Sequence, residues 1–212
     1  MKCTLLVKLA ALLALSVSSS TFASTIYTDS TSFNAVLSST VVDDYQNPAY
    51  VFIQDNATMS AVLGETKYQS TGFNNLNIVP GYYCAGCNGS FKLDFTSTSV
   101  SDASGVFGVG FNFFNIGNPS FDAFVTYGNG TTENIALGNQ GWMAFWGITS
   151  SLEIASIDFG LPNGGYTTYG SFGIDDLTIG NQGYTNVPEP SALLIFGLGL
   201  AGLAFKRRRK VN

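Results

Sequence analysis

Short apolar segments separated by glycine, asparagine, serine and threonine make up the chain between residues 24 and 186. Within several segments apolar residues alternate with polar ones, as at Val125 and Tyr127 or at Ile135 and Leu137. A period of two is typical of β-strands with one buried face. The pattern predicts strands at Thr40–Tyr45, Tyr50–Gln54, Met59–Leu63, Ser90–Phe95, Gly105–Phe114, Phe121–Tyr127, Thr131–Leu137, Trp142–Ile148, Ile154–Phe159 and Phe172–Ile179.

The number and spacing of these strands predict an all-β protein, an antiparallel β-sandwich. The clearest hairpin joins Phe121–Tyr127 to Thr131–Leu137, because Gly128-Asn129-Gly130 between them accepts positive φ angles. One helical turn is expected over Ser32–Ser38, where apolar residues follow Asp29-Ser30 at helical spacing.

Residues 1–23 have the pattern of a secretory signal peptide and predict an N-terminal signal helix. Lys2 and Lys8 give a basic start, Leu9–Val17 is apolar, and Thr21-Phe22-Ala23 offers small residues for cleavage. A first transmembrane helix is the alternative, but the apolar stretch is short and four hydroxyl residues follow it directly. We expect cleavage after Ala23, which leaves residues 24–184 as the exported domain.

The charge of this domain limits its partners. Between residues 24 and 187, thirteen carboxylates stand against two lysines, Lys67 and Lys92, a formal charge of −11. A domain this acidic repels phosphate backbones, so no nucleic-acid binding is expected. The chain has no histidine, which removes the commonest general base and the commonest transition-metal ligand. Cations, neutral sugars and other proteins are the partners that the charge permits.

Residues 185–212 differ in character from the rest of the chain. Two prolines in Val187-Pro188-Glu189-Pro190 predict an extended linker. The uncharged residues 191–205 predict a short transmembrane helix, and the basic cluster 206–210, with Arg207-Arg208-Arg209, is expected to stay in the cytoplasm. Fourteen apolar residues span about 21 Å as a helix, less than the ~30 Å hydrocarbon core, which suits a transient anchor better than a permanent one.

This order of elements resembles the PEP-CTERM sorting signal of Gram-negative bacteria. The resemblance implies recognition by an exosortase, a membrane protease or transpeptidase, and removal of the tail near Pro188-Glu189-Pro190. It also implies a precursor tethered to the inner membrane and delivery to the cell surface or extracellular matrix. The later strands resemble the jelly-roll-like domain of exported bacterial surface proteins, in Gly105–Phe111, Phe145–Ile148 and Phe172–Leu177.

Cys84 and Cys87 are the two cysteines that remain after signal removal, and an oxidising compartment favours a short loop disulfide between them. A redox-active pair is the alternative, but such pairs occur in a thioredoxin-like βαβ context, which the sequence lacks. Zinc would need two further ligands that the sequence does not supply.

Two pairs of acids lie at opposite ends of the domain, Asp43 with Asp44 and Asp175 with Asp176. If the first and last strands meet, these four carboxylates are candidate ligands for Ca²⁺, a cation that takes oxygen ligands. Neighbouring strand residues point to opposite faces, so one of each pair faces a shared site. A solvated strand end, or an Asp that accepts from backbone amides, is the alternative.

Four aromatic residues are candidates for binding sugars: Tyr82 and Tyr83 beside the cysteines, and Trp142 and Trp146 on one predicted strand. Flat rings suit the apolar faces of sugars. The alternative is that Trp142 and Trp146, which have the same parity, fill the core.

Together these features predict a non-catalytic exported protein of the cell surface or matrix that binds calcium and exopolysaccharide. The competing hypothesis is a glycoside-active enzyme that uses two carboxylates, such as Asp122 with Glu133 or Asp158. A structural protein that self-assembles with calcium is the third.

Overall fold

A computed structural model describes residues 24–50, 53, 55–72, 78–79, 81–85, 89–168 and 170–183. The chain divides into two compact units at residue 183, and the elements below belong to the first. In chain order they are β1 (Ser24–Tyr27), α2 (Ser30–Asn34), β2 (Leu37–Asp43), the 3-10 helix η1 (Pro48–Tyr50), α3 (Asn56–Leu63), β3 (Lys67–Ser70), β4 (Ile78–Val79), β5 (Tyr82–Tyr83), β6 (Phe91–Asp94), β7 (Val106–Asn115), β8 (Asp122–Tyr127), β9 (Thr132–Ala136), β10 (Gln140–Gly160) and β11 (Phe172–Gln182).

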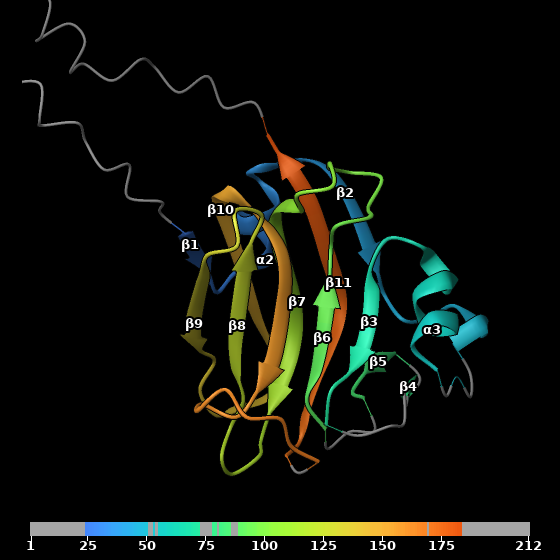
Figure 1. The fold of residues 1–212 in the computed structure, drawn as a ribbon, viewed down its shortest axis with the longest axis vertical. Coiled ribbons are helices and arrows are strands. Elements are labelled where there is room, and N and C mark those ends of the chain that lie inside the picture. Colours follow the sequence, from blue (N-terminus) through green and yellow to red (C-terminus); the bar gives the residue numbers. More distant parts are fainter. Residues whose placement is uncertain are drawn as a thin grey trace, which may run out of the picture. The chain divides into compact units, whose positions relative to one another are not determined.

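Strand β10 belongs to both layers of an antiparallel sandwich. Its first half pairs with β7 through residues 140–149 and with β1 through residues 147–150. Its second half, residues 154–160, pairs instead with β8 and β6. Layer one therefore runs β1, β10, β7, β11, with β2 and β5 on the far edge of β11 and β4 beyond β5. Layer two runs β9, β8, β10, β6, β3 (Figure 1). The predicted all-β sandwich is confirmed at this level, while the jelly roll stays a prediction.

Aromatic rings fill the space between the two layers. Phe111 of β7 contacts Phe159 in the second half of β10, with ring centroids 5.4 Å apart. Phe172 of β11 lies 4.9 Å from Phe159 and 5.6 Å from Phe91 of β6. All four side chains are buried. Because such pairs contribute about 0.5–1.5 kcal/mol each beyond the burial of their area, these rings hold the layers together.

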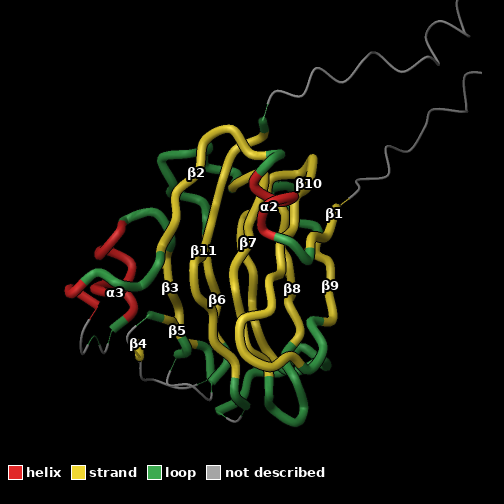
Figure 2. The backbone as a smooth tube through the Cα atoms, turned by 180° about the vertical axis from the view of Figure 1, so that it is seen from behind, coloured by secondary structure: helices red, strands yellow, loops and turns green. Residues whose placement is uncertain are grey.

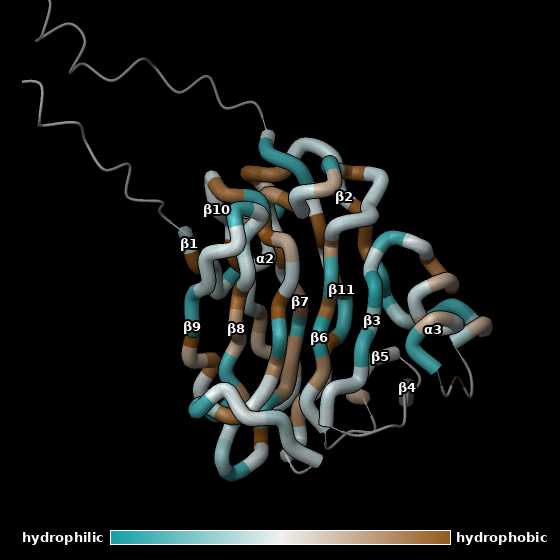
Figure 3. The backbone as a smooth tube through the Cα atoms, in the orientation of Figure 1, coloured by the Kyte–Doolittle hydropathy of each residue, from teal (hydrophilic) through white to brown (hydrophobic). Residues whose placement is uncertain are grey.

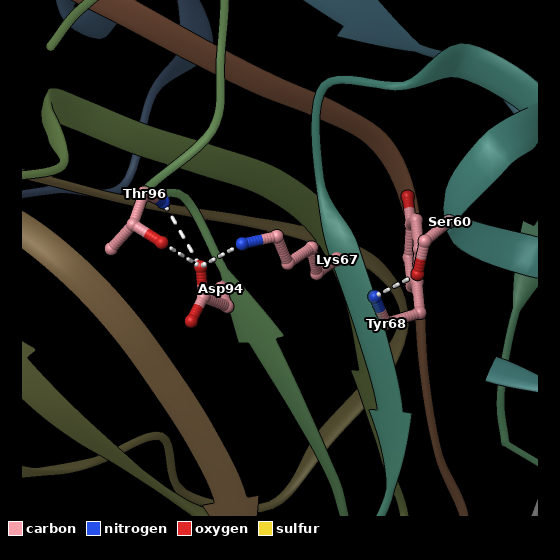
Figure 4. A network of polar contacts seen from close by, with 5 residues as sticks. All are labelled: Ser60, Lys67, Tyr68, Asp94 and Thr96. Atoms are coloured by element: carbon pink, nitrogen blue, oxygen red, sulfur yellow. Dashed lines mark hydrogen bonds and ion pairs between the residues drawn. The ribbon is translucent and has the colours of Figure 1, made fainter. Parts of the chain in front are cut away.

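Hydrophilic and hydrophobic residues alternate along the strands, as Figure 3 shows. On β6, for example, Phe91 and Leu93 are buried while Lys92 and Asp94 are half-buried on the other face. Both lysines of the described chain pair with carboxylates on layer two, Lys67 with Asp94 at 3.9 Å and Lys92 with Asp158 at 3.7 Å. Figure 4 shows the first of these pairs.

The short helix α2 covers the outer face of layer one, as Figure 2 shows. Asp29 caps it by accepting a hydrogen bond from the Ser32 amide at 2.8 Å. Its Phe33 ring is fully buried and lies over glycines of β7 and β10. A Cβ atom at Gly110 would lie 2.7 Å from Phe33 Cε1, and one at Gly147 would lie 2.9 Å from Phe33 Cδ2. The missing side chains at these glycines make room for the ring.

The prediction of a strand at Met59–Leu63 is wrong, because these residues end α3. Asp55 caps this helix by accepting from the Thr58 amide, and Gly64 ends it with a left-handed φ of 79°. The Ser60 hydroxyl then accepts from the amide of Tyr68 in β3 at 2.9 Å (Figure 4). The two caps were visible in the sequence, and they outweigh the apolar spacing that favoured a strand.

Other elements also differ from their predicted bounds; the strand predicted at Thr40–Tyr45, for example, is β2, which runs from Leu37 to Asp43. Trp142–Ile148 and Ile154–Phe159 are parts of one 21-residue strand, β10, since the polar segment between them stays extended where the strand passes from one layer to the other. In the segment predicted as the strand Tyr50–Gln54, Tyr50 is the last residue of η1. Residues 51, 52 and 54 lie outside the described residues. The helical turn predicted at Ser32–Ser38 is α2, which ends at Asn34.

Replacing Gly110 with alanine is expected to lower the free energy of unfolding by about 1–3 kcal/mol, because the added methyl group overlaps the Phe33 ring. Urea denaturation followed by circular dichroism measures the change. Gly141→Ala is the matched control in β10, since a Cβ atom there meets nothing within 4 Å. Equal losses of the free energy of unfolding in the two variants would show that the packing of Phe33 on Gly110 does not stabilise the fold.

Candidate functional site

The outer face of layer one carries the candidate site. Along β7 the odd positions 109, 111 and 113 belong to the core, so Asn112 and Phe114 point to the other face. Phe114 is nevertheless only 4% exposed. A buried ring on an outer face needs a cover, and its neighbours provide it.

Three rings from three strands cover this part of the face. Trp142 of β10 lies over Phe114, with centroids 4.5 Å apart and an interplanar angle of 37°. Tyr82 of β5 meets both edge-on, at 5.5 Å from Phe114 and 5.6 Å from Trp142. The Trp142 side chain is 61% exposed and thus presents its ring to solvent. We call Tyr82, Phe114 and Trp142 the aromatic platform.

Two backbone features place these rings. Gly173 of β11 pairs with Phe114, and a Cβ atom there would lie 2.5 Å from both Cε1 and Cζ of the ring. The register of β10 against β7 shifts between Gln140 and Ala144, and Met143 within that bulge has a φ of 64°. Residues inside a bulge leave the regular alternation of faces. Trp142 lies inside this segment and is exposed, while Trp146 lies beyond it in the regular pairing and is buried, although the two have the same parity.

Polar groups continue the face beside the platform. The Asn112 side-chain amide donates to Asp176 Oδ2 at 2.9 Å. Asp175 is half-buried, and burial raises the pKa of its carboxyl group, with the neighbouring carboxylates of Asp176, Asp44 and Asp43 adding to the rise. Asp176 is exposed and has a φ of 50°. Flat rings can stack on the C–H face of a sugar, and the neighbouring amide and carboxyl oxygens can accept hydrogen bonds from its hydroxyl groups.

The four predicted sugar-binding residues are divided between this face and the core. Tyr82 and Trp142 lie together on the platform, as their ring contact shows. Tyr83 is 0% exposed and packs 4.8 Å from Phe91, and Trp146 is 5% exposed and packs 5.1 Å from Phe111. Phe114 and Gly173 were not among the predicted site residues. The signal for Phe114 was its parity on β7, opposite to that of Phe111 and Phe113.

The first and last long strands meet, as the calcium hypothesis required: β2 pairs with β11, and Asp43 lies opposite Leu177. Asp43 nevertheless points inward and is only 5% exposed, while Asp44 and Asp176 are exposed. Within the described residues, no group of three or more Asp, Glu, Cys or His side chains is arranged to hold a metal ion. Asp43 does not fit a site shared with the other three acids, and calcium binding stays a prediction.

Asp43 instead accepts hydrogen bonds inside a cluster of tyrosines. The hydroxyl of Tyr50 donates to Oδ2, the hydroxyl of Tyr68 lies 2.9 Å from the same oxygen, and the amide of Tyr45 donates to Oδ1 at 3.1 Å. Burial raises the pKa of the Asp43 carboxyl group despite these donors. It also raises the pKa values of the Tyr45 and Tyr68 hydroxyls well above their ordinary range. The cluster joins β2 of layer one to β3 of layer two.

The carboxylates of the enzyme hypothesis come from three strands, β8, β9 and β10. Glu133 of β9 accepts from the hydroxyl groups of Tyr127 and Ser24. Asp158 lies on the outer face of layer two with Lys92, and Asp122 is buried at the start of β8. In the pairing of β8 with β10, Asp122 lies opposite Gly160 and Asp158 opposite Phe124, so these two carboxylates are diagonal neighbours, and the enzyme hypothesis stays a prediction.

Several predicted residues lie outside the described residues: the signal peptide, Cys87, Val187-Pro188-Glu189-Pro190, the helix at 191–205 and the basic cluster. Cys84 is buried and forms a disulfide, and its pairing with Cys87 stays a prediction. No helix in the part of the chain that the structure describes is long and apolar enough to cross a membrane.

Comparison with known proteins identifies the C-terminal end. Residues 186–209 match the family model of the PEP-CTERM protein-sorting motif. The chain therefore carries this motif, as the sequence predicted, and the motif supports an exported protein that an exosortase processes at the membrane. No curated protein and no solved structure matches the chain.

We expect the contribution of Asp43 to the free energy of unfolding to fall as the pH rises above 3.8, the ordinary pKa of an aspartate. The raised pKa of Asp43 means that the native state favours its protonated form, so this contribution is complete below 3.8 and lost through the folded-state pKa. Urea denaturation at a series of pH values measures the slope of the free energy of unfolding against pH. Asp43→Asn should reduce this slope, whereas Asp44→Asn, which removes only the smallest of the causes that raise the pKa of Asp43, should change it less. Identical slopes for Asp43→Asn and the natural protein would contradict this account.

Proposed function

We propose that this protein is a non-catalytic component of the cell surface or extracellular matrix that binds neutral exopolysaccharide through the aromatic platform. The observation that carries the proposal is the exposed Trp142 ring held over Phe114 and Tyr82. An exposed ring held by two other rings loses little conformational freedom on binding, which favours affinity.

The charge of the domain supports a neutral ligand. Thirteen carboxylates stand against two lysines between residues 24 and 187. Both lysines are already paired with Asp94 and Asp158. An anionic polymer would meet repulsion without a free cation to offset it, whereas hydroxyl groups of a neutral sugar can donate to Asp175 and Asp176.

Delivery to this location rests on the sorting motif at residues 186–209. An exosortase cleaves the tail near Pro188-Glu189-Pro190 in this proposal, and the domain then leaves the inner membrane. A polysaccharide-binding face would retain the released protein in the matrix. In this proposal, sorting and polysaccharide binding both keep the protein at the cell surface or in the matrix. The two predictions below test them separately.

Trp142→Ala is expected to weaken binding to the purified exopolysaccharide of the native host about tenfold or more, the effect of truncating a central aromatic contact. Affinity gel electrophoresis with the polysaccharide in the gel measures it. Tyr166→Ala is the matched control, since the Tyr166 side chain is 63% exposed and makes none of the platform contacts. Equal mobility of the natural protein and Trp142→Ala would refute the role of the platform.

Replacing Pro188, Glu189 and Pro190 together with alanine should leave the tail attached, because the extended linker that the processing enzyme recognises is lost. Intact-mass spectrometry of the protein from the native host shows whether the tail is present. Glu153→Ala, a single carboxylate change in β10, should be processed like the natural protein. Normal removal of the triple variant's tail would exclude this segment as the recognition element.

A further inference from the structure

A contact between Ser24 and Glu133 joins the two layers at one side of the sandwich. Ser24 is the first residue of β1, at the edge of layer one, and Glu133 lies in β9, at the edge of layer two. The Ser24 hydroxyl donates to Glu133 Oε1 at 3.1 Å. Among the described strands β1 pairs with β10, over four residues. The contact with Glu133 therefore holds the start of a short strand that has few other bonds.

Glu133 is a half-buried carboxylate that has no basic side chain as a partner in the described part of the chain. Its Oε2 accepts from the hydroxyl group of Tyr127, which is a neutral donor. The two lysines of this region are already paired with other carboxylates. A carboxylate that is partly removed from water is stabilised by a nearby cation, because solvent screens their attraction less than at an exposed site.

Signal cleavage after Ala23 supplies a cation at this position. Hydrolysis of the peptide bond between Ala23 and Ser24 consumes one water molecule and leaves a carboxylate on Ala23 and an amine on Ser24. A free N-terminal amine has an ordinary pKa of about 7.7–8.0 and is therefore protonated below this pH. The Ser24 nitrogen and hydroxyl oxygen are joined through one Cα–Cβ bond, so they are about 3–4 Å apart. Because the hydroxyl contacts Glu133, rotation of the Glu133 side chain can bring its carboxylate to the new ammonium group.

The other polar groups next to Ser24 are neutral. Ser150 of β10 pairs with Ser24 and carries a hydroxyl group. Burial, together with the hydrogen bond to Glu133, raises the pKa of Tyr127 to about 12. The Tyr127 hydroxyl therefore remains a neutral donor over the pH range in which an N-terminal amine titrates.

Two further carboxylates lie on or beside the elements that pack against β1, and both have partners of their own. Glu153 of β10 interacts with Asp102, which contributes to a raised pKa of Glu153 after the larger effect of burial. Asp29 follows the other end of β1 and caps α2 through the Ser32 amide. Glu133 is thus the carboxylate that the ammonium group meets.

We propose that Glu133 binds the N-terminal ammonium group of the mature chain, so that removal of the signal peptide fixes β1 to layer two. In the precursor the same nitrogen belongs to a neutral peptide bond. Because Glu133 favours the charged amine in the native state, the ion pair contributes fully below the ordinary pKa of about 7.7–8.0 and is lost as the pH rises through the higher folded-state pKa. The proposal rests on cleavage after Ala23, and it depends neither on sugar binding nor on tail removal.

The pH dependence of N-terminal acetylation tests the proposal on protein purified from its native host. Acetic anhydride reacts with the free amine, so the rate, followed by mass spectrometry of the N-terminal peptide, reports the deprotonated fraction. Glu133→Gln should lower the midpoint of the rate profile and raise the rate at pH 7 about threefold. Glu65→Gln is the matched control, because Glu65 accepts from Ser99 beside β3, at the opposite end of layer two, and it should leave the profile unchanged.

A purely structural role of Glu133 gives a different profile. Loosening of β1 would raise the acetylation rate by the same factor at every pH, including the plateau where the amine is fully deprotonated, and would leave the midpoint unchanged. That result, or identical profiles for Glu133→Gln and the natural protein, would overturn the proposal. So would an intact mass that shows the mature chain to begin at a residue other than Ser24.

One glycine inserted between Ala23 and Ser24 keeps the test decisive if Glu133→Gln does not fold. The insertion moves the ammonium group about 3.5 Å along the chain and changes no side chain of the domain. With cleavage after Ala23 checked by intact mass, the acetylation midpoint should fall toward the ordinary pKa of the amine. The thermal unfolding midpoint at pH 6.5 should fall by about 2–4 °C. An acetylation midpoint equal to that of the natural protein would contradict the assignment of Glu133.

Discussion

The pairing of β10 in both layers is the constraint on which the rest of the structure depends. Its first half hydrogen-bonds with β7 and β1, and its second half with β8 and β6. The two layers are therefore parts of one continuous hydrogen-bonded network, and their facing rings, Phe111 and Phe159, are brought together by a single chain segment and its neighbours. The bulge near the start of β10 then decides which aromatic residues reach solvent.

The two sides of the sandwich are closed in different ways. On the side of β2 and β3, the buried carboxyl group of Asp43 is surrounded by tyrosine hydroxyls, so polar groups are paired in the interior. On the side of β1 and β9, the Ser24 hydroxyl donates to Glu133 at 3.1 Å, and Ile26, Ile135 and Leu137 contribute to the wall of a cavity of about 700 Å³. The first side is closed by paired polar groups, and the second keeps an open cavity.

The outer face of layer one shows how small residues create a site. Glycines in β7 and β10 leave room for the Phe33 ring of α2, and Gly173 leaves room for Phe114. Rings that would otherwise stand exposed are thus pressed against the sheet, and Trp142 is the ring left open to solvent. A rigid, uncharged surface of this kind beside amide and carboxyl groups, on a domain with a large excess of carboxylates, suits neutral polymers better than anionic ones.

The sequence alone determined the strand class, the acidity of the domain and the sorting motif, because periodicity, charge and a short ordered motif are local properties. It also placed Tyr82 and Trp142 among the candidates, but it could not separate them from Tyr83 and Trp146. That separation depends on the bulge in β10, which contains Trp142 but not Trp146, and on the register of β5 against β11. Likewise, the meeting of β2 with β11 was expected, but the inward direction of Asp43 was decided by the pairing register. Side-chain direction in a sheet changes with a shift of one residue, and only tertiary pairing fixes that shift.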